Sequence, residues 1–260
     1  MGILLNLLEA SGIEPLAALM LVVLLVFLFF LLFADKRVRF GFRPTLRPLP
    51  GFALLDGFVG QAVETGRTLH VSMGTRGIGG ASTADTMAGL MALERLAEQA
   101  VATGLKLVIT VSDPSLLPIA QDTLRRAYER RGYPQGYNPE HLRYIAPDAI
   151  AYAAGVMGIL EREDVVANAM IGGFGDEFLL MGENGARKGI QQVGGASSPE
   201  TLPLVYISMD EALLGEEIYA GGAYLSSKPS HLGSLLAQDW LRSAIILAII
   251  LGVLIRTLLL

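Results

Sequence analysis

The chain has 260 residues, enough for one sizeable domain together with membrane segments. Hydrophobic residues make up 52% of it, more than in an ordinary soluble protein, and they are concentrated at the two ends. There is no cysteine, which excludes disulfides, thiolate metal sites and a cysteine nucleophile. The formal net charge is −5. Because basic residues crowd after the first apolar segment, the rest of the chain is acidic and unsuited to binding nucleic acid.

The first apolar segment, residues 16–33, predicts a membrane-spanning helix. At about 1.5 Å per residue it nearly crosses a hydrocarbon core of about 30 Å, and flanking residues supply the remainder. A cleaved signal peptide is the alternative, but Glu9 and Glu14 precede the segment and Asp-Lys-Arg follows it. We therefore expect residues 1–34 to form an N-terminal segment and the first membrane helix. Within residues 1–14 we expect a short helix in the outer interface.

The second apolar segment predicts another membrane helix over residues 243–260, after a linker at residues 226–242. Arg256 lies near the C-terminus, where its side chain can extend to the headgroups. Trp240 and Arg242 are expected to anchor this helix at the membrane interface. Ala244, Ala248 and Gly252 fall on one side of it and are expected to form a stripe that packs against another helix. The alternative for the stripe is that alanine and glycine are simply common in membrane helices.

The orientation follows from the basic residues after the first helix, in a proline-rich linker at residues 35–50. Positively charged residues favour the cytoplasmic side, so Lys36, Arg37 and Arg39 are expected at the inner interface, with Arg43 and Arg47 beyond them. This predicts a two-pass protein of the inner (cytoplasmic) membrane. Its central domain is cytoplasmic and both termini lie outside.

Residues 51–225 alternate between short apolar runs and helical patterns. Strands are expected at residues 69–73, 105–111, 142–145, 165–171 and 204–208, with a further one near 190–193. Helices are expected at 56–65, 83–103, 148–160, 176–188 and 211–225, and another follows the turn at 112–114 and ends near residue 131. The run 105–111 is apolar enough to be covered on both faces. This alternation predicts an α/β domain with a Rossmann-like, doubly wound, mostly parallel sheet.

A glycine-rich turn at residues 74–83 joins the first strand to a helix. Backbone N–H groups and a helix N-terminus at this position favour an anion such as phosphate. The candidate ligand residues are Gly74, Gly77, Gly79, Gly80, Ser82, Thr83 and, after the second strand, Asp113. The spacing is not Gly-x-Gly-x-x-Gly and no lysine follows, so a tight turn without a ligand is the alternative. Ser82 is expected to cap the helix.

Glycine pairs recur along the chain. Gly-Gly-Ala-Ser occurs at residues 79–82 and 194–197, and looser echoes occur at 171–175 and 220–224. These segments either line a common crevice or allow close packing of backbone on backbone. Packing is favoured for the pair at residues 221–222, and the other pairs stay open.

No catalytic residue, metal site or cofactor is predicted. Five carboxylates fall near strand ends or helix starts, where they could hold Mg²⁺ or cap helices: Asp113, Asp176, Glu177, Asp210 and Glu211. The three histidines lack the spacing of a zinc site. A basic patch, formed by Arg125, Arg126, Arg130 and Arg131, indicates either a solvated helix face or a contact with anionic lipid.

Three runs, at residues 86–95, 152–163 and 215–226, resemble a family of uncharacterised prokaryotic membrane proteins catalogued as a domain of unknown function. The family is met in Chloroflexi-like bacteria and some archaea. The resemblance covers the chain from about residue 50 to the C-terminus, and the run at 152–163 is its most specific part. It implies a membrane location and a two-helix layout, and it supplies no catalytic residues.

The sequence thus leads to the hypothesis of a membrane-anchored, self-associating scaffold or assembly protein, with no evident catalytic activity. Its expected partners are the lipid bilayer and further copies of itself. The alternative is a membrane-tethered sensor or enzyme that binds a nucleotide or another phosphate ligand at residues 74–83. A third hypothesis is a subunit of a larger membrane complex.

Overall fold

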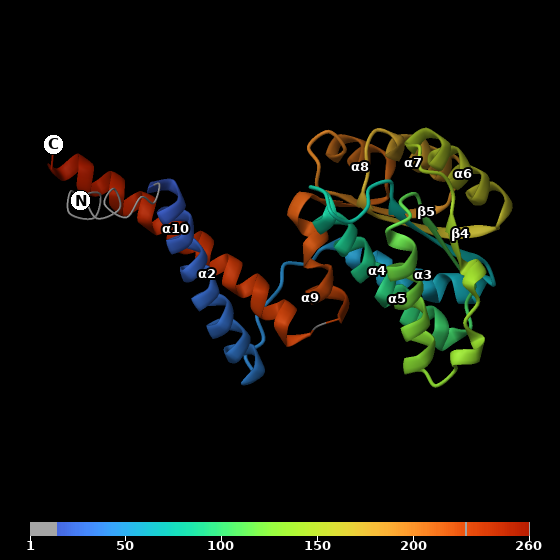
Figure 1. Cartoon of the computed structure of the whole chain (residues 1–260), viewed down its shortest axis with the longest axis horizontal. Helices are drawn as coiled ribbons and strands as arrows, with labels where there is room; N and C mark the ends of the chain where they lie inside the picture. Colours follow the sequence, from blue (N-terminus) through green and yellow to red (C-terminus); the bar gives the residue numbers. More distant parts are fainter. Residues whose placement is uncertain (1–14, 227, 260) are drawn as a thin grey trace. The chain divides into compact units, whose positions relative to one another are not determined.

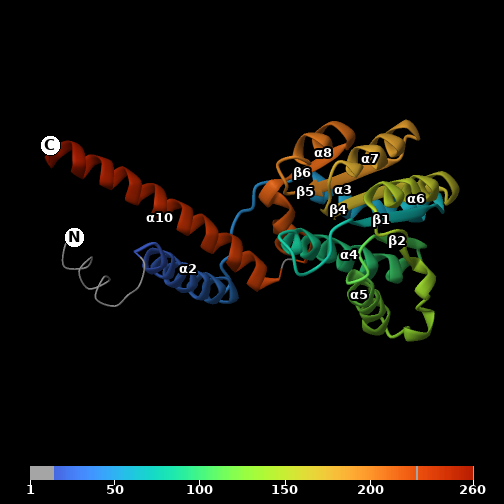
Figure 2. The same ribbon diagram turned by 45° about the horizontal axis from the view of Figure 1, so that its top comes forward.

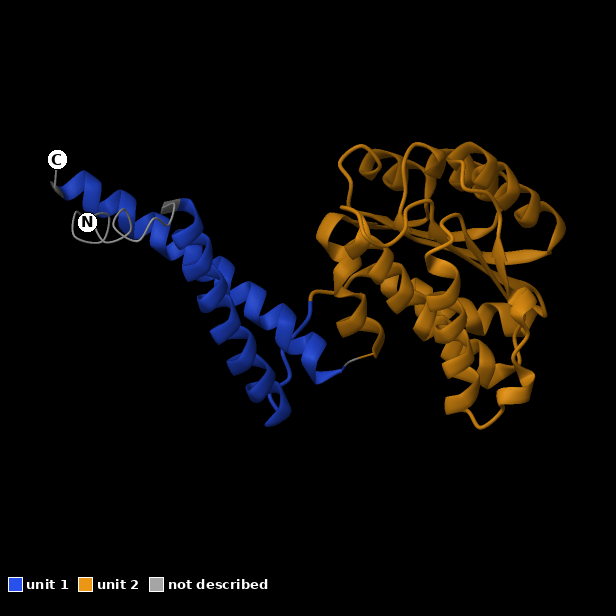
Figure 3. Ribbon diagram, in the orientation of Figure 1, with its two compact units in different colours: residues 1–46, 227–260 blue, residues 47–226 orange. Residues whose placement is uncertain are grey.

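The computed structural model describes residues 15–226 and 228–259 of the chain (Figure 1). The chain divides into two compact units: unit 1 holds residues 1–46 and 227–260, and unit 2 holds residues 47–226 (Figure 3). The two apolar ends of the chain therefore belong to one unit and its α/β portion to the other. The short interfacial helix expected within residues 1–14 lies outside the described residues.

Unit 1 is described as two long helices, α2 (Pro15–Arg39) and α10 (Pro229–Leu259). Both are long and apolar enough to cross a membrane, and the most apolar stretch of each is not buried within the chain. The helix α10 begins inside the segment expected to be a linker, because proline fits the first turn of a helix and the apolar pattern already starts there.

The two helices of unit 1 pack against each other through aromatic and small residues. The Trp240 ring lies 6.1 Å from the Phe30 ring and 5.7 Å from the Phe33 ring, measured between centroids. At Gly233 the helices approach so closely that a Cβ atom would lie 2.9 Å from the Asp35 Cα. A glycine is therefore needed at this contact.

Unit 2 is a three-layer α/β domain built on a parallel sheet. Its strands are β1 (Thr68–Gly74), β2 (Leu107–Val111), β3 (Leu142–Tyr144), β4 (Val165–Gly173), β5 (Gln191–Ala196) and β6 (Glu211–Leu214). They lie in the order β3-β2-β1-β4-β5-β6, and every pair of neighbours is parallel. The predicted α/β class and doubly wound sheet are confirmed. Since the strand order reverses between β1 and β4, the crossover connections leave the sheet on opposite sides there.

Helices cover both faces of the sheet (Figure 2). One face carries α6 (Ala149–Arg162), α7 (Glu177–Arg187) and α8 (Leu202–Ser208); the other carries α3 (Pro50–Thr65), α4 (Thr83–Thr103) and α5 (Leu116–Arg130). Short 3₁₀ turns, η1 (Pro134–Gly136), η2 (Pro139–His141) and η3 (Gly215–Ala220), and the helix α9 (Gly221–Ser226) complete the unit. Every residue of β1, β2 and β4 is buried, as expected of strands covered on both faces.

Local signals explain several helix boundaries. Gly66 and Gly104 follow α3 and α4 in the left-handed conformation, with φ of 68° and 69°, which glycine adopts without strain. At the start of α6, the Asp148 side chain accepts a hydrogen bond from the Ala151 N–H at 2.9 Å. Ser82 occupies the N-cap position of α4, but the expectation that its side chain caps the helix is wrong, because that side chain makes no capping hydrogen bond there.

Two further predictions are wrong. Residues 204–208 were expected to be a strand and lie in α8, where Pro203 occupies the first turn. A short apolar run fits either structure, and a proline at this position favours the helix. Residues 211–225 were expected to be one helix, but residues 211–214 form β6, which pairs with β5. Glutamate, alanine and leucine all favour helices, so the pairing of this segment with β5 outweighs its local helical preference.

Candidate functional site

The strongest candidate for a site lies at the carboxyl edge of the sheet, where the loops after β1 and β4 meet. In doubly wound sheets, ligands bind where the strand order reverses, because the loops there diverge to opposite faces. The residues that face this edge come from the loop at 75–82, from residues 174–177 after β4 and from residues 197–201 after β5.

The loop after β1 begins with close contact between two backbones. Gly74 has a φ of +89°, and a Cβ atom there would lie 2.4 Å from the Gly173 carbonyl oxygen. That oxygen accepts hydrogen bonds from the N–H groups of Thr75 at 2.9 Å and Arg76 at 3.1 Å. A Cβ atom on Gly172 would in turn lie 2.3 Å from the Met73 carbonyl oxygen. These glycines allow the ends of β1 and β4 to pack together.

The glycine pair in β5 also serves packing. A Cβ atom on Gly194 would lie 2.5 Å from the Met209 side chain, and one on Gly195 would lie 2.8 Å from the Ile218 side chain. The structure therefore supports the packing interpretation for residues 171–175 and 194–197. The glycines at 79 and 80 differ, since no atom lies within 4 Å of a Cβ built on either.

A cavity of about 310 Å³ opens beside the loop after β1. It is lined by Arg76, Gly77, Ile78, Gly80, Ala81, Ser82 and Asp113. Four of the predicted ligand residues are among these, and Gly74, Gly79 and Thr83 are not. The structure thus brings the carboxylate after β2 next to the glycine-rich loop, as the sheet topology requires.

The cavity carries one cation and one carboxylate. Arg76 is exposed and makes no ion pair with any residue that the structure describes. Asp113 packs against Gly77, where a Cβ atom would lie 2.3 Å from its Cγ, and its Oδ1 accepts the Ser115 N–H at 2.7 Å. The guanidinium is therefore the group at this edge that is available to an anion.

Several polar groups of the loop are already paired within the chain. The Ile78 N–H donates to Ser115 Oγ at 3.3 Å, and the Gly79 N–H donates to Thr83 Oγ1 at 3.0 Å. Thr83 Oγ1 itself donates to the Gly80 carbonyl at 2.7 Å. A phosphate cradle needs several free N–H groups that point to one place. These bonds favour a self-contained turn over a dinucleotide-binding loop.

A buried carboxylate, Glu177, lies beside the loop. The sequence suggested it only as one of five possible metal ligands or helix caps. Glu177, 4% exposed at the start of α7, accepts hydrogen bonds on Oε1 from Thr75 Oγ1 at 2.6 Å and from the Gly175 N–H at 2.8 Å. It joins the loop after β1 to the loop after β4. In the sequence, only its position after a glycine-rich strand end could have drawn attention to Glu177. Its partner Thr75 lies about a hundred residues away in the chain.

A second buried carboxylate ties three elements together. Asp85 of α4 accepts hydrogen bonds from Ser197 Oγ at 2.7 and 2.8 Å and from the Tyr219 hydroxyl at 2.5 Å. Burial, together with the hydrogen bond to Asp85, raises the pKa of Tyr219. The tyrosine therefore stays protonated and donates its hydrogen bond to Asp85, as a contact that stabilises the fold requires. Nothing in the spacing of these residues predicts their meeting.

Residues 12–260 match the family described as a domain of unknown function, DUF6754. The chain belongs to the DUF6754 family. Neither the curated proteins nor the solved structures contain a match to it. The predicted resemblance to a family of unknown function is thereby confirmed, and the family supplies no activity or site.

In this DUF6754 member, a row of polar side chains crosses the buried face of the sheet under α6, α7 and α8. His70 Nδ1 lies 2.7 Å from Asn168 Oδ1, and His70 Nε2 lies 3.1 Å from Thr110 Oγ1. Asn168 Nδ2 donates to Gln192 Oε1 at 2.9 Å. Since the asparagine oxygen must then accept, His70 carries its proton on Nδ1 and accepts the Thr110 hydroxyl on Nε2.

The row continues to a tyrosine of α6. The Tyr152 hydroxyl lies 2.9 Å from Thr110 Oγ1 and 2.7 Å from Ser72 Oγ. Burial lowers the pKa of His70 from 6.5 to about 4 and raises the pKa of Tyr152 from 10.0 to about 12. Both side chains are therefore neutral near pH 7. No local pattern predicts this network, because its members lie on four strands and a helix.

The five carboxylates considered as metal ligands do not converge in the DUF6754 chain. Asp113 and Glu177 lie at the carboxyl edge, whereas Asp210 and Glu211 lie at the amino end of β6. Asp210 Oδ2 accepts the Gln192 N–H at 2.7 Å. Within residues 15–226 and 228–259, no group of three or more histidine, aspartate or glutamate residues could hold a metal ion.

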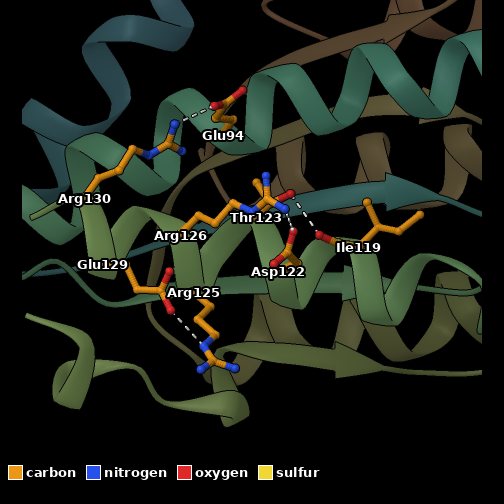
Figure 4. Close-up of polar contacts among 8 residues, drawn as sticks. All are labelled: Glu94, Ile119, Asp122, Thr123, Arg125, Arg126, Glu129 and Arg130. Atoms are coloured by element: carbon orange, nitrogen blue, oxygen red, sulfur yellow. Dashed lines mark hydrogen bonds and ion pairs between the residues drawn. The ribbon is translucent and has the colours of Figure 1, made fainter.

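The basic patch on α5 is largely neutralised by neighbouring carboxylates (Figure 4). Its ion pairs are Arg125–Glu129 at 3.0 Å, Arg126–Asp122 at 2.7 Å, Arg130–Glu94 at 3.0 Å and Arg130–Glu98 at 3.1 Å. Arg131 follows the helix as its C-cap. The pairs of Arg130 connect α5 to α4. This pattern favours a solvated, ion-paired surface over a lipid contact.

The residues expected at the membrane interface lie in unit 1. Lys36, Arg37 and Arg39 occupy the last turn of α2, and Trp240 packs on α2. In the predicted helix-packing stripe, Ala244 is half-buried, whereas Ala248 and Gly252 are exposed. No atom lies within 4 Å of a Cβ built on Gly252. That end of the stripe therefore makes no close contact within the described chain.

Proposed function

We propose that this DUF6754 protein is a membrane-anchored scaffold that associates with further copies of itself through its α/β domain. The observation that carries the proposal is the exposure of two large side chains that follow each other in α8, the aromatic Tyr206 at 70% and the aliphatic Ile207 at 67%. Exposed apolar side chains of this size, next to each other on an ordered helix, favour a protein contact. No catalytic activity is part of the proposal.

Other residues of the same helical layer support it. Ile150 of α6 is 60% exposed and Leu180 of α7 is 44% exposed. A groove of about 250 Å³ between α6 and α7 has Met157, Leu179 and Leu180 in its lining. Most soluble assemblies are formed by identical subunits, so a second copy is the expected occupant.

The anchoring part of the proposal rests on α2 and α10. Both have the length and apolar composition of membrane-spanning helices. The basic residues that end α2 favour a cytoplasmic position for unit 2, with both termini outside. Two anchors would confine the domain to a plane and raise its effective concentration for lateral association.

Replacing Ile207 by glutamate is expected to weaken self-association at least tenfold, because a charge would have to be buried in the contact. The full-length chain in membranes is crosslinked with an amine-reactive reagent, and the yield of dimers and larger products is measured. The matched control is Ile119→Glu. This exposed position lies on α5, on the opposite face of the sheet from α8, so the change should leave the yield of crosslinked products unchanged. A wild-type chain that gave only monomer would contradict self-association. Co-purification of a stoichiometric foreign protein would instead identify a subunit of a larger complex.

A second candidate function, the binding of a nucleotide or another phosphate ligand, is favoured by Arg76 at the cavity beside the loop. If it holds, a ligand at one hundred times its Kd raises the free energy of unfolding by about 2.7 kcal/mol. The change Arg76→Gln should abolish this stabilisation, and so should Gly79→Val, since position 79 has a φ of +104°. Thermal unfolding is measured with a panel of nucleotides and inorganic phosphate. Arg131→Gln is the control, and no stabilisation by any compound would remove this function.

A further inference from the structure

The end of α2 combines unpaired cations with an exposed aromatic ring. Lys36, Arg37 and Arg43 are exposed and make no ion pair with the residues that the structure describes, whereas Arg39 is paired with Asp35 at 2.7 Å. Phe40, directly after the helix, is 82% exposed. We call residues 36–43 the juxtamembrane cluster.

A defined turn sets the shape of the juxtamembrane cluster. Gly41 has a φ of +100°, and its N–H donates to the Val38 carbonyl at 3.0 Å. The Phe42 N–H donates to the Arg37 carbonyl at 3.2 Å, which completes a glycine-terminated helix end. The turn places the Phe42 ring 4.5 Å from the Arg37 guanidinium carbon. This cation–π contact orients the arginine and leaves Phe40 outside the packing.

From this geometry we infer that the juxtamembrane cluster binds the phosphate groups of anionic phospholipids, with Phe40 inserted among the lipids at the interface. The inference rests on the proposed membrane location of α2. Arginine and lysine bind phosphate through charge-assisted hydrogen bonds. Aromatic side chains favour the boundary between headgroups and hydrocarbon.

Position favours a lipid headgroup over a free phosphate or a peptide. The cations directly follow the apolar residues of α2, so a bilayer around that helix would bring headgroups to the level of residues 36–43. A strongly exposed phenylalanine beside cations adds nothing to the binding of a soluble anion. It does add to binding at a surface that offers both charge and hydrocarbon.

The full-length chain in phosphatidylcholine nanodiscs provides the test, with spin-labelled phosphatidylglycerol and phosphatidylcholine as probes. Each cation near an anionic surface is expected to contribute about a fivefold preference. Arg43→Gln should therefore lower the preference for phosphatidylglycerol about fivefold, and the triple change of Lys36, Arg37 and Arg43 to glutamine should remove it. Arg125→Gln, in an ion pair on α5, is the control. Because the chain has no cysteine, a spin label on Phe40→Cys reports directly whether this position lies among lipids.

The outcomes separate the inference from the proposed function. If the chain does not incorporate into nanodiscs, the proposed membrane location fails. If it incorporates but shows equal affinity for both probes, only the inference is overturned. Displacement of phosphatidylglycerol by inorganic phosphate at constant ionic strength would identify a general anion site and also overturn it. Loss of the preference at high salt, with retention of the chain in the disc, is the expected result.

Discussion

Replacing Gly89 by alanine is expected to lower the free energy of unfolding by about 3 kcal/mol, although alanine is the better helix former. Gly89 lies in α4, where it faces the central strand β4. A Cβ atom there would lie 2.3 Å from the Ile171 carbonyl oxygen. That oxygen belongs to the backbone of a fully buried strand and cannot turn away. The helix would have to move off the sheet and leave a void beside Met73.

The matched control for this change is Gly57→Ala in α3. This glycine is also helical, but it is exposed and no atom lies within 4 Å of its Cβ position. The control should stabilise the chain by about 0.5–1 kcal/mol, because alanine loses less backbone entropy in a helix. Unfolding of the full-length chain in detergent is followed by circular dichroism. Equal effects of the two changes would show that α4 does not contact β4 as closely as described.

Acidification from pH 7 to pH 4 is expected to remove about 3 kcal/mol of stability through His70 alone. Burial lowers the pKa of this histidine from 6.5 to about 4. Between these two values the unfolded chain binds a proton that the folded chain does not, so stability falls as the pH falls. Protonation in the folded state would turn Nε2 into a donor facing the Thr110 hydroxyl, which now donates to it.

The comparison of wild type with His70→Gln isolates this effect. The variant cannot titrate at this position. Between pH 7 and pH 4 its free energy of unfolding should therefore decrease by about 3 kcal/mol less than that of the wild type. Glu163, whose pKa is lowered by hydrogen bonds from Lys106 and Arg143, titrates in both proteins and cancels in the difference. Identical pH profiles for the two proteins would show that His70 is not buried in a neutral form.

Much of the fold could be predicted from periodicity and from glycine and proline positions. The long helix at residues 83–103 and the buried strand expected at 105–111, which begins at Leu107 in the structure, could be identified because their patterns are strong. The errors at 204–208 and 211–225 concern short segments without a distinctive period. Residues 211–214 become a strand because they pair with β5, and residues 204–208 lie in a helix that packs against α7. Such long-range contacts cannot be inferred from a local sequence pattern.

The candidate site was predicted in part. Gly77, Gly80 and Ser82 were proposed because they belong to a glycine-rich turn before a helix, and Asp113 because it follows the second strand; these four residues line one cavity in the structure. Arg76 could not be predicted to line the cavity, because an exposed arginine in a loop belongs to no recognisable sequence pattern. The contacts of Glu177 and Asp85 could not be predicted, because their hydroxyl partners come from distant loops.

The sequence alone determined the two apolar helices, the α/β class and the absence of cysteine chemistry, since each depends on composition or on a repeating local pattern. Only the tertiary structure decided which glycines serve packing, which carboxylates are buried and which polar side chains join into the row around His70. Those properties depend on distances between residues far apart in the chain. Such distances are fixed only when the strands take their order in the sheet.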